Sequence, residues 1–120
     1  MTTEITAETA RVRRIEVRPR DGEPDAHANH ALVPARAEFG DGVTIHAARI
    51  FLIQAPIDDA QLRRIDEELL TDAVCQTSHA GASDAAGGML IEVHYKPGVM
   101  DPVAQSTRDT IVEMLPGLNL

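Results

Sequence analysis

The residues of this chain that could hold a metal ion are its histidines. His27 and His30 are three residues apart on an expected helix and could share one face, while His94 lies on an expected strand. A zinc site needs a third and a fourth ligand, and the sequence has neither a pair of cysteines nor an HExxH motif. We therefore expect no metal in this chain and interpret these side chains as surface or half-buried histidines.

Cys75 is the single cysteine, so the chain cannot close an internal disulfide. Its apolar neighbours Ala73 and Val74 favour a buried, inert thiol over a nucleophile, because a nucleophilic cysteine needs an adjacent base. Residues 1–14 contain no apolar run long enough for a signal peptide or a membrane span. Together these features predict a cytoplasmic protein.

No other group of residues has a spacing typical of catalysis. Glu16, Glu92 and Asp84 do not form a recognisable acid–base pair, and we interpret them as surface carboxylates. The glycines within residues 80–88 are not followed by the GKS or GKT of a phosphate-binding loop. We therefore expect no catalytic and no cofactor-binding residue in this chain.

The composition sets limits on the size and the partners of the protein. Its 120 residues are 43% hydrophobic and 25% charged, which is typical of one soluble globular domain or slightly more. The net charge of −8 repels phosphate backbones and anionic lipids, and only Phe39, Phe51 and Tyr95 could stack on bases. We expect neither a nucleic acid nor a membrane as partner.

The first half of the chain has the patterning of an α+β protein. Residues 12–20 alternate between apolar and charged side chains, which predicts a half-buried strand. Asp25 is a candidate cap for a helix over 26–39, which must kink or begin late because it contains Pro34. The apolar stretch 43–55 predicts one long bent strand, or a hairpin turning near its middle, at the centre of the sheet.

The middle of the chain predicts a helix and then a short strand. Asp58 and Gln61 form a capping-box-like start for a helix that extends to Leu70. The outer face of this helix, which includes Asp66, carries an excess of acidic residues, and we interpret it as a solvated face. The strand is expected over 74–79.

The last third of the chain begins with a run of small residues over 80–88, which is typical of a flexible connector. A strand is expected over 89–95. Asp101 followed by Pro102 is a helix cap with proline at the first helical position. The expected helix has one face lined by Val103, Thr107, Ile111 and Met114.

The second half of the chain repeats the first at an offset of 76 residues. Five of twelve aligned positions are identical, where average residue usage gives about one. The identical pairs are Ile15/Ile91, Glu16/Glu92, Val17/Val93, Gly22/Gly98 and Asp25/Asp101. Each copy has the order strand, glycine turn, acidic cap, helix. The equivalent of the apolar stretch 43–55 is missing from the second copy, so we expect a fragment of a longer protein or self-association.

Residues 91–106 (IEVHYKPGVMDPVAQS), 48–53 (ARIFLI) and 68–74 (ELLTDAV) carry a resemblance to a known family. From Val12 onward, the chain resembles the PurS module of phosphoribosylformylglycinamidine (FGAM) synthase. In that family PurS is a small non-catalytic subunit, or a fused N-terminal region in which two copies mimic a dimer. The motif residues that match are Lys96, Pro97, Gly98, Asp101 and Pro102, with Arg49 as a candidate partner contact.

The resemblance implies a ferredoxin-like, PurS-type layer of order strand-helix-strands-helix-strand over residues 12–79. A disordered N-terminus would occupy residues 1–11, and a connector over 80–88 would lead to an incomplete second strand-helix copy over 89–120. The implied function is to assemble the synthetase and glutaminase parts of FGAM synthase in de novo purine synthesis. ATP and Mg belong to the synthetase part, so the resemblance carries no cofactor or catalytic residue to this chain.

The sequence departs from the family pattern in two places. The first copy has DGEPDA where the second has PGVMDP. Near Arg49, the family's usual basic, glycine and tyrosine positions are occupied by His46, Ala48 and Ile50. The alternative interpretation is a regulatory domain of ACT-like type, which would bind a small molecule and act as a dimer.

Overall fold

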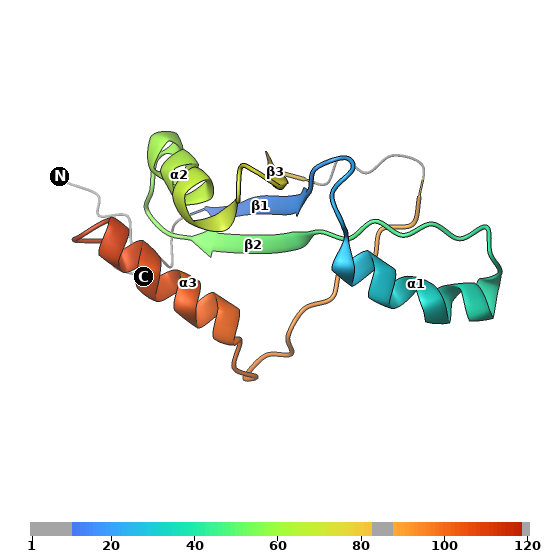
Figure 1. Cartoon of the computed structure of the whole chain (residues 1–120). Helices are drawn as coiled ribbons and strands as arrows, with labels where there is room; N and C mark the ends of the chain where they lie inside the picture. Colours follow the sequence, from blue (N-terminus) through green and yellow to red (C-terminus); the bar gives the residue numbers. More distant parts are fainter. Residues whose placement is uncertain (1–10, 83–87, 119–120) are drawn as a thin grey trace.

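The computed structural model of the protein describes residues 11–82 and 88–118 and contains a small antiparallel sheet with helices (Figure 1). The sheet has three strands in the order β2-β1-β3, and β1 pairs antiparallel with both neighbours. The strands span Val12–Pro19 (β1), Arg49–Gln54 (β2) and Gln76–Ala80 (β3). The expected α+β class is therefore confirmed.

The alternating pattern of β1 gives the sheet two different faces, as the sequence predicts. Ile15 and Val17 are 2% and 4% exposed and belong to the hydrophobic core. Arg14, Glu16 and Arg18 alternate with them along the strand and therefore lie on the opposite face. One face of the sheet is thus apolar, and the other has a charged central strand.

The helical elements begin at side-chain caps. They are α1 (Ala26–Phe39), α2 (Asp59–Ile65) with the π-helical turn η1 (Asp66–Leu70), and α3 (Pro102–Met114). Asp58 and Gln61 form the reciprocal capping box that the sequence predicts. A late start of α1 is wrong, because Asp25 accepts a hydrogen bond from the Ala28 N–H and the helix includes Pro34.

The core lies on the apolar face of the sheet. Ile15, Val17 and Ile53 of the strands form one cluster with Leu62, Ile65 and Leu70 of α2 and η1 and with Ile111 of α3. Met114, Leu115 and Leu118 pack against this cluster. Figure 1 shows α2 and α3 at one end of the molecule, while α1 extends beyond the other end of the sheet. Two helices therefore cover the sheet, and α1 is not one of them.

The apolar stretch 43–55 is shorter as a strand than expected and is not central. Only Arg49–Gln54 forms β2, which lies at an edge of the sheet, and residues 43–48 have no regular secondary structure. The prediction of a central strand failed because an apolar sequence does not by itself fix the position of a strand in the sheet. The more polar β1 pairs on both sides and is the central strand. The predicted third strand is confirmed with a small shift, as β3 over Gln76–Ala80.

The expected strand over 89–95 is wrong, since these residues have no regular secondary structure. Met89, Ile91 and Val93 are between 74% and 90% exposed. A strand needs a neighbour to pair its backbone groups, and none of the three described strands pairs with these residues. The second copy of the repeat therefore forms its helix, α3, but not the strand that precedes it.

Two expectations concern residues that the structure does not describe. Of residues 1–11, where we expect a disordered N-terminus, only Arg11 is described. Of the expected connector over 80–88, residues 83–87 lie outside the described residues. Among the helices that are described, none is sufficiently long and apolar to cross a membrane.

Candidate functional site

The motif residues Lys96, Pro97 and Gly98 form a tight turn. The Val99 N–H donates to the Lys96 carbonyl oxygen at 3.0 Å. Gly98 has φ +81°, a left-handed conformation that side chains with a Cβ rarely adopt. No atom outside the turn lies within 4 Å of the position that a Cβ at Gly98 would take, so glycine is needed here for its backbone freedom alone.

Asp101 and Pro102 begin α3. One carboxylate oxygen of Asp101, Oδ1, accepts hydrogen bonds from the N–H groups of Val103 and Ala104, each at 3.1 Å. Pro102 is the first helical residue. The N–H of a first helical residue has no partner within the helix, so the missing N–H of proline costs no hydrogen bond there. The two residues thus satisfy donors that would otherwise be unpaired at the start of the helix.

The equivalent residues of the first copy have the same geometry. Gly22 has φ +86°, close to the value at Gly98. Asp25 caps α1 by accepting from the N–H three residues further on, as Asp101 does in α3. The helices begin at residues 26 and 102, which are 76 apart. The sequence repeat is therefore also a repeat of turn, cap and helix.

Arg49 lies apart from this turn. It is the exposed first residue of β2, opposite Val17 of β1, and no described hydrogen bond or ion pair joins it to the turn residues. The structure therefore does not bring Arg49 and the Lys96–Pro102 motif into one site.

A cluster of ion pairs on the charged face of the sheet was missed by the sequence analysis. Glu16 is only 6% exposed, and its two carboxylate oxygens lie 3.5 Å from guanidinium nitrogens of Arg14 and Arg18. Arg14 also lies 3.2 Å from a carboxylate oxygen of Glu92, which in turn contacts His94 at 3.2 Å. We name these five residues the arginine–glutamate cluster.

The arginine–glutamate cluster corrects the interpretation of Glu16 as an ordinary surface carboxylate, because Glu16 is buried, whereas Glu92 is exposed as expected and is held by two partners. Hydrogen bonds from His94 and Arg14 lower the pKa of Glu92 below its usual value, so this side chain is held as a carboxylate. The alternation of Arg14, Glu16 and Arg18 in the sequence indicated that these charged side chains share one face of the strand. The burial of Glu16 on that face could not be predicted, because burial depends on tertiary structure. Asp84 lies outside the described residues.

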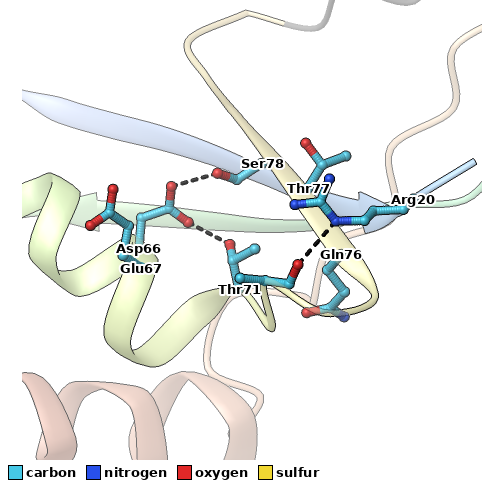
Figure 2. Close-up of a pocket in the computed structure, with 8 residues that line it drawn as sticks. Arg20, Asp66, Glu67, Thr71, Gln76, Thr77 and Ser78 are labelled. Carbon is cyan, nitrogen blue, oxygen red and sulfur yellow. Dashed lines mark hydrogen bonds between the residues drawn. The ribbon is translucent and has the colours of Figure 1, made fainter.

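A polar pocket of about 200 Å³ lies between η1, β3 and the end of β1 (Figure 2). Asp66 points into it, and its two oxygens accept hydrogen bonds from the hydroxyl groups of Thr71 and Ser78, each at 2.5 Å. The Arg20 Nε donates to the Ala73 carbonyl oxygen at 3.0 Å. Asp66 is therefore half-buried and joins η1 to β3, whereas the sequence analysis assigned it to a solvated face.

Cys75 lies beside this pocket region and is partly buried. Partial burial and the neighbouring Asp72 carboxylate raise the pKa of its thiol above the ordinary value. A raised pKa leaves little thiolate at neutral pH, so this environment does not activate a nucleophile.

The histidines are not gathered at one place. His27 and His30 are exposed on α1, and His94 belongs to the arginine–glutamate cluster. Within residues 11–82 and 88–118, no three His, Cys, Asp or Glu side chains are placed to hold a metal ion together.

Comparison with known proteins gives no match. No family model, no curated protein and no solved structure matches this chain.

Proposed function

We propose that the chain is a PurS-like, non-catalytic assembly module of FGAM synthase, supporting the ATP- and glutamine-dependent step of de novo purine synthesis in the cytoplasm. The observation that carries the proposal is the KPGVMDP run, residues 96–102, as the second copy of a repeated turn, cap and helix. This run resembles the PurS motif, and its repetition is similar to the fused form of that family.

The sheet supports this proposal through its strand order. The first strand is central, with antiparallel neighbours on both sides, and its two covering helical elements pack on one face. A ferredoxin-like layer that lacks one edge strand has the same order. In chain order the missing edge strand corresponds to residues 43–48, which precede β2 and have no regular secondary structure.

The exposed apolar surface is the second source of support. Met89, Val93 and Met100 are among the most exposed large apolar side chains, at 87%, 90% and 70%. In the described part of the chain, the outer edges of β2 and β3 pair with no further strand. Open strand edges and exposed large apolar side chains are typical of surfaces that associate with another chain. We propose the synthetase part of FGAM synthase, and self-association, as the interactions made here.

The test is reconstitution with purified components. The chain is mixed with the glutaminase part and with a synthetase part that lacks its own PurS-like region. Complex mass is measured by size-exclusion chromatography with light scattering, and glutamine-dependent FGAM formation is measured in parallel. We expect a complex containing the chain and faster FGAM formation. Elution of the chain by itself, with no change in rate, would contradict the proposal.

A pair of arginine variants tests the candidate contact. Arg49→Ala is expected to weaken the complex, whereas Arg36→Ala, which removes an exposed charge from α1, is expected to leave it unchanged. Equal effects of both variants would remove Arg49 from the interface. If the chain does not join the complex but is stabilised in thermal melts by an amino acid, the ACT-like interpretation replaces the proposal.

A further inference from the structure

The apolar face of the sheet is covered by a helix from the other copy of the repeat. In the first copy, α1 connects β1 to β2, yet α1 contributes no residue to the core cluster. Its only buried residue is Ala28, and Val33 and Phe39 are 75% and 77% exposed. The second copy's helix, α3, instead buries Ile111 against the sheet and α2.

The two helices are equivalent in sequence position and in geometry. Both follow a glycine with positive φ and an aspartate cap, and their first residues are 76 apart. At this offset, the buried Ile111 corresponds to Ala35, and Leu115 corresponds to Phe39. Leu32, Ala35 and Phe39 have the spacing of one helix face, so α1 has its own apolar stripe.

The connections of α1 are long enough for it to lie on the sheet. β1 ends and β2 begins at the same end of the sheet, because Val17 is opposite Arg49. A helix of 14 residues is about 21 Å long. Residues 40–48 can span roughly 30 Å when extended. This is longer than α1, so the chain could return from the end of α1 to the start of β2 with α1 lying on the sheet. Residues 20–25, with Gly22, and residues 40–48 would have to reorient, and the hydrogen bond from the Ala47 N–H to the Asp25 carboxylate would have to move with them or break.

The connection of α3 allows it to leave the sheet. Residues 81–101 separate β3 from α3, and those that the structure describes contain no helix or strand. A connection of this length holds its helix near the sheet without fixing its position.

We propose that the apolar face of the sheet is a single helix-binding surface for which α1 and α3 compete, and that α1 covers it when α3 leaves. In this structure α3 occupies that surface. Its Ile111 and Met114 bring more apolar surface to the core than the equivalent Ala35 and Glu38 of α1 would bring. The helix that is displaced exposes its own apolar stripe.

The test gives α1 the two core side chains of α3. Backbone hydrogen exchange of the full chain is followed by mass spectrometry, in the wild type and in Ala35→Ile/Glu38→Met. We expect the amides of α1 to exchange on the order of tenfold more slowly in the variant, and those of α3 to exchange faster by a similar factor. Isoleucine has a lower helix propensity than alanine, so slower exchange cannot come from propensity.

A matched control and a reverse variant complete the test. Ala37→Ile changes an exposed position whose equivalent, Glu113, is also exposed, and it should neither slow exchange in α1 nor speed exchange in α3. Ile111→Asp should release α3 and slow exchange in α1. Competition is overturned if α1 slows while α3 is unchanged, or if neither helix responds to Ala35→Ile/Glu38→Met, a variant that leaves every residue of the core cluster in place.

Discussion

Glu16 and Glu92 are equivalent positions of the repeat, and both form ion pairs with the same guanidinium nitrogen, Nη2 of Arg14, at 3.5 Å and 3.2 Å. In β1, Glu16 is buried. Glu92 lies in a segment without regular structure. The second copy is therefore linked electrostatically to the central strand of the first, although it forms no strand of its own.

Asp101→Ala should destabilise the protein by about 1 kcal/mol, because the Val103 and Ala104 N–H groups lose their acceptor. Chemical denaturation measures the change in the free energy of unfolding. Asp101→Asn is the control, since asparagine also caps helices well and should retain most of the stability. Equal stability of Asp101→Ala and the wild type would show that α3 does not depend on this cap.

Gly98→Val should cost about 1–2 kcal/mol, because φ +81° places a Cβ against the following carbonyl group. The surroundings are open, so the expected cost arises only from the backbone. Gly98→Asn should cost less, since asparagine tolerates this conformation better. Thermal melts of the two variants compare these costs, and equal melting temperatures would rule out a requirement for positive φ.

Local features of the fold could be predicted from the sequence. The strand at Ile15, the capping box at Asp58 and the cap at Asp101 are each determined by residues close together in the chain. Local sequence could not predict whether residues 89–95 form a strand. Their sequence resembles that of β1, but a strand also needs a neighbouring strand to pair with.

The arginine–glutamate cluster illustrates the same limit for the candidate site. The spacing of Arg14, Glu16 and Arg18 predicts a charged strand face, and such faces are usually solvated. The approach of Glu92 to Arg14 depends on contacts between residues 78 apart. Similarly, helical periodicity placed Asp66 on an outer face, whereas its carboxylate accepts a hydrogen bond from Ser78 of β3, a contact that depends on how β3 packs against η1.

Glu16→Gln should destabilise the protein by about 1–3 kcal/mol, because two arginines lose the buried carboxylate between them. In Arg14→Gln/Glu16→Gln, the combined loss should be smaller than the sum of the two single losses. A double-mutant cycle by urea denaturation measures this coupling. Strict additivity would show that the pair contributes no net interaction.

The stability contribution of Glu92 should depend on pH. Its pKa in the folded protein lies below the ordinary value of 4.5, so its pairing with His94 and Arg14 stabilises the fold above about pH 4.5. This contribution is lost as the pH falls through the lowered folded pKa. NMR titration of the Glu92 carboxyl group should show the low pKa, and Arg14→Ala should raise it. A Glu92 pKa that does not respond to Arg14→Ala would contradict the pairing.

Cys75 should react slowly with thiol reagents at neutral pH. Partial burial and the Asp72 carboxylate raise its pKa above 9.0, which reduces the thiolate fraction. The rate of alkylation by iodoacetamide, measured against pH, should therefore rise with a midpoint above that of a free cysteine peptide. Asp72→Asn should shift the midpoint down by removing a nearby negative charge, whereas Glu38→Gln, on the exposed surface of α1, should not shift it. A midpoint in the wild type below that of the peptide would instead indicate an activated thiol, and would make Cys75 a candidate nucleophile.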